Sequence, residues 1–301
     1  MDFTIETYNK LLGILQNKGF VFQSFAGFIQ KPGKKVIILR HDVDKLPENS
    51  LTIARLESSL GVRGSYYFRS VPSGYNEEII RNVAELGHEV GYHYEDVARC
   101  AVRGLRHAAG RRSTRLQDNG RYEEELVKIA IESFKENLAK LREIVPVKTI
   151  CMHGSPLSKW DSRLLWKYYD YRDFGIIGEP YFDIDFNKVC YITDTGRMWD
   201  GDSFNIRDKG TGNSQQDIGE ENRMPHAANL KPFPKFHTTF DIIRAAEEDR
   251  LPDKIMMTFH PQRWTDKPLP WVKELVWQNV KNVGKYFLVK WRDKEEVGSR
   301  K

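Results

Sequence analysis

Five apolar runs of this sequence are each closely followed by a histidine or an aspartate, side chains that bind metal ions and move protons. The runs and their polar residues are Val36–Leu39 with Asp42 and Asp44, His88–Tyr92 with His93 and Glu95, Thr149–Met152 with His153, Cys190–Thr193 with Asp194, and Lys254–Phe259 with His260. Continuous apolarity is typical of strands buried on both faces. Because the carboxyl ends of parallel strands lie together, we expect these side chains to share one site.

Asp42 and Asp44 are two residues apart at the end of a predicted strand, so both carboxylates point to the same side. Two like charges that close repel each other unless a cation lies between them or one carboxylate is protonated. The alternative interpretation is a pair of aspartates that caps a turn. A buried run has no other need for two charges, which favours a functional pair.

His93 and Glu95 repeat this spacing after the second run. A single histidine is more often a packed core residue than a ligand, but this one follows a strand in the same way as the aspartates. An aspartate, a histidine and a third nitrogen or oxygen donor, with one open position, form the arrangement of a catalytic zinc site. Glu95 and His153 are both candidates for the third ligand.

His260 precedes Pro261, whose ring restricts the residue before it to an extended backbone. A histidine held in this way suits a proton donor, and the alternative is a histidine that packs against a loop. Gly154 and Ser155 follow His153 and offer backbone N–H groups with little steric cover, which predicts an oxyanion contact.

Helical patterns alternate with the apolar runs. Apolar spacing predicts helices around residues 11–15, 51–60, 79–86 and 126–141. Ser65–Phe68 and Tyr286–Val289 predict two further strands. Strands that alternate with helices predict an α/β fold with a mostly parallel sheet, either closed as a barrel or open.

Two segments interrupt the alternation. Residues 99–121 contain seven arginines, typical of a solvated loop or of a cradle for a nucleotide diphosphate, a lipid diphosphate or an acidic glycan. Residues 200–235 are rich in Gly, Asn, Asp and Pro and predict a long loop over the barrel mouth.

Composition limits the function classes. No apolar stretch is long enough for a membrane span and the first residues do not resemble a signal peptide, so we expect a cytoplasmic protein. The three cysteines are far apart and predict neither a disulfide framework nor a cysteine metal site. A net charge of +5, with no aromatic residues interleaved in the basic segment, argues against a nucleic-acid partner.

Four motifs together resemble a known family. Asp42-Val43-Asp44, Gly87–His93, His153–Pro156 and Thr258–Pro261 occur in the order found in the NodB-homology polysaccharide deacetylases, carbohydrate esterase family four. The likeness covers residues 36–264 and looks closest to an atypical branch associated with bacterial surface-polysaccharide gene clusters. The resemblance implies a distorted (β/α) barrel, a divalent metal that is commonly zinc, and hydrolysis of N-acetyl groups from sugars.

The resemblance also implies roles for single residues: Asp42 as catalytic base, Asp44 and His93 as metal ligands, His260 as catalytic acid, and Asp194 and Trp199 as the pair that borders the sugar groove and tunes the acid. Three positions depart from the family. Val97 stands where the second metal histidine is usual, His153 where an arginine is common, and Thr258 where a leucine is common. The missing ligand is then Glu95 or His153, or the metal is weak or absent.

These observations predict one catalytic domain over residues 1–301, with a helical lead-in over about 1–33 and the arginine-rich insertion over about 99–121. The expected activity is metal-dependent removal of an N-acetyl group from an amino sugar or oligosaccharide, as a surface-polysaccharide precursor carried on a nucleotide or lipid diphosphate. The rival interpretation is a carbohydrate-binding relative without catalytic activity, favoured by the valine at position 97.

Overall fold

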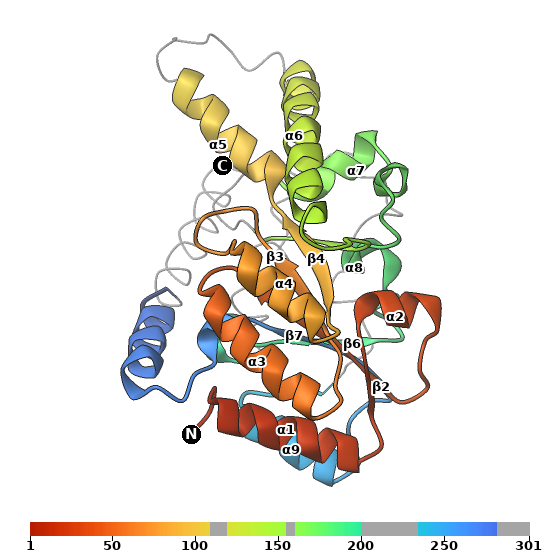
Figure 1. The fold of residues 1–301 in the computed structure, drawn as a ribbon, viewed down its shortest axis with the longest axis vertical. Coiled ribbons are helices and arrows are strands. Elements are labelled where there is room, and N and C mark those ends of the chain that lie inside the picture. Colours follow the sequence, from red (N-terminus) through yellow and green to blue (C-terminus); the bar gives the residue numbers. More distant parts are fainter. Residues whose placement is uncertain (109–118, 155–159, 200–233, 282–301) are drawn as a thin grey trace, which may run out of the picture.

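The structure is a computed structural model that describes residues 1–108, 119–154, 160–199 and 234–281. It has a mixed α/β fold in which a parallel sheet curls into a half-barrel (Figure 1). The strands are β1 (Val21–Gln23), β2 (Val36–Val43), β3 (Ser65–Phe68), β4 (Glu89–Tyr94), β5 (Ile150–Met152), β6 (Cys190–Thr193) and β7 (Lys254–Phe259). The prediction of an α/β fold with a parallel sheet is confirmed, and the half-barrel is compatible with a distorted (β/α) barrel.

The helices surround this sheet. The α-helices are α1 (Ile5–Asn17), α2 (Phe25–Gln30), α3 (Pro47–Ser59), α4 (Glu77–Glu85), α5 (Asp96–Ala108), α6 (Asn119–Arg142), α7 (Leu165–Tyr168), α8 (Pro180–Asp183) and α9 (Thr239–Glu247). The 3₁₀ helices are η1 (Ser162–Leu164), η2 (Tyr171–Phe174), η3 (Thr195–Arg197) and η6 (Pro261–Arg263). None of the helices in the described part of the chain combines the length and apolar character that a membrane span requires.

The strand order is β5-β4-β3-β2-β7-β6, and β1 pairs with β2 beside this path. Every pair is parallel, so all carboxyl ends lie at one rim of the sheet. Strand β2 is central and the longest, pairing with β1, β3 and β7. Its Arg40 is level with Thr258 of β7, and its Asp42 is level with Tyr67 of β3. This register places the end of β2 in the middle of the rim.

Alternation along β2 decides which face each side chain occupies. Val36 and Ile38 belong to a small apolar cluster that α2 helps to cover, whereas Ile37 and Leu39 belong to the main core beneath the outer helices. Arg40 and Asp42 continue the first series of even positions. They therefore reach the concave side of the half-barrel.

Local signals in the sequence fix where the helices begin and end. Helix α1 starts after Thr4, whose side chain accepts a hydrogen bond from Thr7 N–H, and α3 has Pro47 in its first turn. Helix α4 ends before Gly87, which has a φ of +87° that an L side chain rarely adopts. The four predicted helices are confirmed as α1, α3, α4 and α6.

The arginine-rich segment differs in part from the expected loop. Residues 99–108 continue α5, because Val97, Ala98 and Ala101 are buried at helical spacing and α5 packs against α6. In Figure 1 these two helices project together from one end of the molecule. Residues 109–118, most of the predicted loop at 200–235 and the predicted strand Tyr286–Val289 lie outside the described residues.

The lead-in contains a strand as well as two helices. Strand β1 pairs with the beginning of β2, with Val21 beside Val36. Helix α1 packs against α9, which places the first residues of the chain next to residues 239–247 (Figure 1). The lead-in is thus part of the half-barrel and its outer layer.

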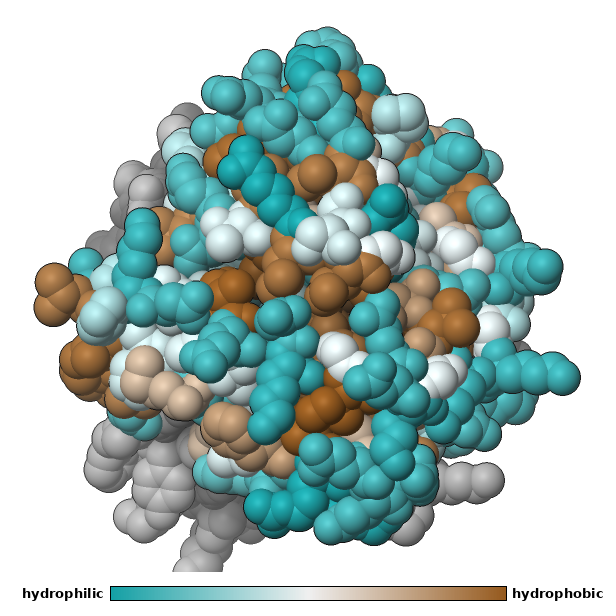
Figure 2. Space-filling view, turned by 60° about the horizontal axis from the view of Figure 1, so that its bottom comes forward, coloured by the Kyte–Doolittle hydropathy of each residue, from teal (hydrophilic) through white to brown (hydrophobic). Residues whose placement is uncertain are grey.

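Residues 268–281 form a helix with polar residues on its inward side and apolar residues on its exposed side. Its inward side carries Glu274, which pairs with Lys45 at 3.1 Å, and the buried Gln278. Its exposed side is apolar, with Leu269, Val272, Val276, Trp277 and Val280 each 49–83% exposed. In Figure 2 apolar residues lie at the left edge, the side on which Figure 1 places this helix, and also across the centre of the view.

Candidate functional site

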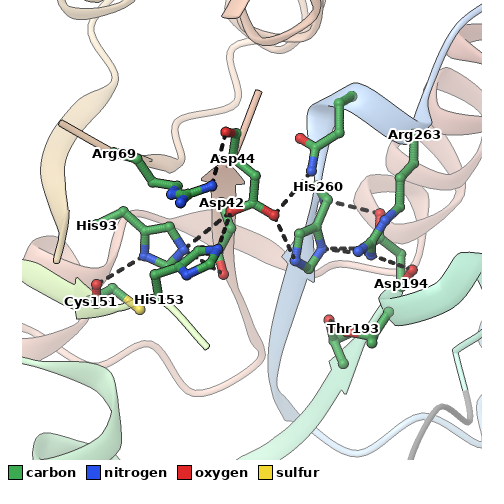
Figure 3. A network of polar contacts seen from close by, with 12 residues as sticks. Asp42, Asp44, Arg69, His93, Cys151, His153, Thr193, Asp194, His260 and Arg263 are labelled. Carbon is green, nitrogen blue, oxygen red and sulfur yellow. Dashed lines mark hydrogen bonds and ion pairs between the residues drawn. The ribbon is translucent and has the colours of Figure 1, made fainter. Parts of the chain in front are cut away.

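Polar side chains from five strand ends meet at the rim of the half-barrel (Figure 3). They are Asp42 and Asp44 from β2, His93 from β4, His153 after β5, Asp194 after β6, and His260 after β7. In Figure 3 the two aspartates lie in the middle, with the first two histidines on one side and the third histidine on the other. The structure therefore assembles two groups around a shared pair of carboxylates.

The first group has the geometry of a metal centre. Asp44, His93 and His153 each place a ligand atom within 4.8 Å of the others. Asp44 Oδ1 lies 3.6 Å from His93 Nε2 and 3.3 Å from His153 Nε2, and this buried oxygen has no hydrogen-bond partner among the described residues. Three converging donors with an unsatisfied carboxylate oxygen fit a divalent cation.

The charges of this group depend on each other. Burial alone would raise the pKa of Asp44, but its contacts with His153 and His93 outweigh burial and hold the pKa well below its usual range. Burial would lower the pKa of His93, but the carboxylates of Asp42 and Asp44 raise it above the usual value. The cluster thus stabilises the anionic carboxylates that a metal ion requires.

The backbone directs His93 toward this centre. Its Nδ1 lies 2.9 Å from the carbonyl oxygen of Cys151 on the neighbouring strand β5. Because a carbonyl oxygen only accepts hydrogen bonds, Nδ1 carries the proton and donates it. In the neutral imidazole the lone pair is then on Nε2, which faces both aspartates.

Glu95 lies beside the first group but is held by an arginine. Both of its carboxylate oxygens accept hydrogen bonds from Arg69, at 2.8–3.1 Å. Its Oε2 is also 3.4 Å from His153 Nδ1. Of the two candidates for a third ligand, His153 therefore lies with Asp44 and His93, while Glu95 lies behind His153.

Asp42 forms a buried ion pair with Arg40, two residues earlier on the same strand. Arg40 Nε and Nη2 donate to Oδ1 and Oδ2 at 2.8 and 2.7 Å. Burial opposes ionisation of Asp42, but the charges of Arg40 and His93 outweigh burial and lower its pKa to about 2. Asp42 is thus a fixed, fully ionised carboxylate whose Oδ2 lies 3.6 Å from His93 Nε2.

Cys151 offers a second set of metal-type donors together with Asp42 and His93. Burial holds the pKa of this thiol well above its usual value. A metal ligand must be the thiolate, so the protonated thiol is a poor donor. Asp44, His93 and His153 form the better set.

The second group is built around His260. Its Nδ1 lies 2.5 Å from Asp194 Oδ1, and its backbone N–H donates to Asp194 Oδ2 at 3.0 Å. Arg263 and Trp264 also donate to this carboxylate, each at 2.7 Å. Burial would raise the pKa of Asp194, but Arg263 and His260 outweigh burial and lower it.

This arrangement turns His260 Nε2 toward the first group. Nε2 is 3.9 Å from Asp44 Oδ2, and Gln262 Nε2 donates to the same oxygen at 3.2 Å. Asp44 therefore joins the metal-type cluster to the second histidine. A histidine whose Nδ1 is held by a carboxylate can take up or release a proton at Nε2.

Three predicted site residues lie elsewhere or are only partly described. Trp199 is 4% exposed, packs against Phe259 and Trp264, and donates to Thr239 at 3.0 Å. It thus supports the end of β7 from the core and does not line the rim. Gly154 is exposed beside His153, and Ser155 lies outside the described residues.

Three arginines of the site were not assigned a role from the sequence. Arg40 lies two residues before Asp42 on a strand, and this spacing was a signal that their side chains share a face. Arg69 directly follows β3, so including Ser65–Phe68 among the site-forming runs would have found it. Arg263 was not evident, because the turn of η6 returns its side chain to Asp194.

The fold and site thus define an α/β half-barrel protein with a buried Asp/His cluster at the carboxyl rim of its sheet. A scan against protein-family models matched no family, and searches of curated proteins and of solved structures gave no significant match.

Proposed function

We propose that this chain is a metal-dependent hydrolase that removes an N-acetyl group from an amino sugar, on a half-barrel of the polysaccharide deacetylase type. One observation carries the proposal. Asp44, His93 and His153 form a three-donor cluster, and a fixed carboxylate, Asp42, and a carboxylate-held histidine, His260, both lie beside it. Hydrolysis of an amide needs all three elements: activation of water, a proton acceptor and a proton donor.

The proposed cation is zinc, held by one carboxylate and two histidines with a further position open. When bound, such an ion supplies Lewis-acid activation of water and of the substrate carbonyl. Asp44 Oδ1 supports this assignment, because it is buried and has no hydrogen-bond partner among the described residues. The protonated Cys151 and the arginine-bound Glu95 are weaker candidates.

The proton steps are assigned to Asp42 and His260. Asp42 is ionised throughout the physiological range, and Arg40 fixes the direction of its carboxylate, so it accepts the proton of the attacking water. His260 donates a proton to the leaving amine from Nε2. Asp194 stabilises the positive charge that His260 carries before this donation.

The substrate proposal is an N-acetylated sugar or oligosaccharide that serves as a cytoplasmic precursor, on a nucleotide or lipid diphosphate carrier. Neutral sugars suit a rim with one charged cluster. The arginine-rich segment is the proposed contact for an anionic carrier, and its side chains from 103 to 121 lie outside the described residues.

The second candidate function is a sugar-binding protein without catalytic activity. It is favoured by Val97, fully buried at the position where the family has its second metal histidine. His153 offers a replacement from another strand end, and this favours the hydrolase.

The test combines metal analysis with acetate release. Purified protein is loaded with zinc and assayed on N-acetylated oligosaccharides and sugar nucleotides. The Asp44→Ala and His153→Ala variants are compared with Asp170→Asn, a change at an exposed site. We expect one zinc per chain and acetate release in the wild type and in Asp170→Asn, loss of both in Asp44→Ala, and weakened zinc binding with loss of acetate release in His153→Ala. Acetate release that survives Asp44→Ala or full chelation refutes the hydrolase. Sugar binding without any acetate release supports the second candidate.

A further inference from the structure

The two histidines of the metal-type cluster are oriented by different partners. His93 Nδ1 has a neutral partner, the carbonyl oxygen of Cys151 at 2.9 Å. His153 Nδ1 is buried, makes no hydrogen bond to any described residue, and has the carboxylate of Glu95 3.4 Å away. The backbone of His153 is already fixed, because its N–H donates to Tyr94 O at 2.8 Å. The buried atom of His153 without a hydrogen-bond partner among the described residues is therefore Nδ1.

Glu95 is held in the place where it could supply that partner. It is 4% exposed and receives three hydrogen bonds from the guanidinium of Arg69. The Arg69 charge balances the Glu95 carboxylate, which removes the cost of burying it alone. Each carboxylate oxygen accepts more than one hydrogen bond, so Oε2 still has capacity for His153 Nδ1–H.

We infer that Glu95 is a positioning residue that makes His153 the third metal ligand. Glu95 accepts a hydrogen bond from His153 Nδ1–H, which keeps the proton on Nδ1 and the lone pair on Nε2, 3.3 Å from Asp44 Oδ1. The contact closes from 3.4 Å to hydrogen-bond length by a shift of a few tenths of an ångström. A carboxylate behind a metal-binding histidine fixes its tautomer and increases its basicity.

Arg69 extends this support to a second strand. It follows β3, which lies between β2 and β4 in the sheet, and its Nη1 donates to the backbone oxygen of Asp44 at 3.3 Å. One guanidinium thus contacts both the residue that supplies the carboxylate ligand and the carboxylate behind His153, and Figure 3 shows the first of these contacts. This explains how a site with Val97 in place of a histidine completes its ligand set from β5.

The inference rests on the metal site of the proposed function but not on the reaction, so the test measures metal binding. The variants are Glu95→Gln, Arg69→Met and His153→Ala, with Glu132→Gln as a matched control because Glu132 is 65% exposed. Zinc affinity is measured by competition with a chelating dye. The number of imidazole ligands is measured by X-ray absorption at the zinc edge. Circular dichroism checks that each variant folds.

We expect Glu95→Gln to bind zinc about 10–100-fold more weakly while keeping two imidazole ligands. Arg69→Met should weaken zinc binding in the same direction, again with two imidazoles. His153→Ala should retain one imidazole, and Glu132→Gln should match the wild type. If Glu95 had only a structural role, Glu95→Gln would change the circular dichroism spectrum without this selective loss of zinc affinity.

Two results overturn the inference. The first is wild-type zinc affinity in Glu95→Gln. The second is a zinc centre that has one imidazole ligand in the wild type and loses an oxygen ligand in Glu95→Gln. In that case Glu95 itself is the third ligand. A two-imidazole centre in a protein that releases no acetate leaves the inference standing and refutes the hydrolase. A wild-type protein that binds no zinc refutes both.

Discussion

Replacing Arg40 by methionine tests whether the Arg40–Asp42 pair holds the centre of the rim. The pair is buried, with side-chain exposures of 3% and 7%. Lowering the pKa of Asp42 from 3.8 to about 2 corresponds to roughly 2 kcal/mol of net stabilisation of the ionised form. That figure already includes the opposing cost of burial. Removing Arg40 takes away the largest favourable contribution to this shift and leaves burial opposed mainly by His93, and breaking buried pairs typically costs about 3–5 kcal/mol.

The assay is urea unfolding of four proteins: wild type, Arg40→Met, Asp42→Asn and the double variant. We expect Arg40→Met to lose about 3–5 kcal/mol of unfolding free energy, and the double variant to lose less than the sum of the single losses. Arg172→Met is the control, since Arg172 is 56% exposed and its ion pairs should contribute about 1 kcal/mol or less. A loss below about 1 kcal/mol in Arg40→Met, or strict additivity in the double variant, would refute the reasoning.

Three further predictions concern the site and its support. Asp194→Asn removes the carboxylate that holds His260, so kcat for acetate release should fall about 10²–10⁴-fold with KM nearly unchanged; an unchanged kcat contradicts the role of the pair. Burial raises the pKa of Glu179 from 4.5 to about 7, so the stability it confers is complete below pH 4.5 and is lost as the pH rises through 7. Urea unfolding should therefore show the wild type losing about 3 kcal/mol more than Glu179→Gln between pH 4.5 and pH 8, and parallel pH curves would exclude this. Chelation of zinc present at about 100 times its Kd should lower the free energy of unfolding by about 2.7 kcal/mol, and should leave Asp44→Ala unaffected.

Much of the strand and helix pattern could be predicted because each element carries its own signal. The run Ser65–Phe68 is strand β3 with the same bounds, and Lys254–Phe259 is β7. The charge of the arginine-rich stretch favours a solvated loop, yet residues 99–108 are helical, and Val97, Ala98 and Ala101 are buried at helical spacing in α5, which packs against α6. Such tertiary packing overrides local composition and is not visible in the sequence alone.

The sequence could predict which residues reach the site, but not which of their side chains contact each other. Strand ends indicated Asp42, Asp44, His93 and His260, because parallel strands bring them to one rim. Whether a side chain would contact a metal or would instead hydrogen-bond to a metal-binding side chain depends on shifts of a few tenths of an ångström in side-chain position. The sequence leaves Glu95 and His153 as alternatives, whereas the structure places His153 beside Asp44 and His93 and pairs Glu95 with Arg69.

Unsatisfied polar atoms give independent support for the location of the site. Buried side-chain atoms without a hydrogen-bond partner among the described residues belong to Asp44, His153, Arg197, Thr258, Gln262 and Arg263. Every one of these residues lies at or just after the carboxyl end of β2, β5, β6 or β7. Elsewhere the structure satisfies even a buried glutamate: Glu57 accepts hydrogen bonds from Tyr8 and Tyr66 and lies 2.8 Å from His41 Nε2, on the opposite face of β2 from Asp42. The unsatisfied atoms of the described residues therefore gather at the rim, which is the location proposed above for the metal and the substrate.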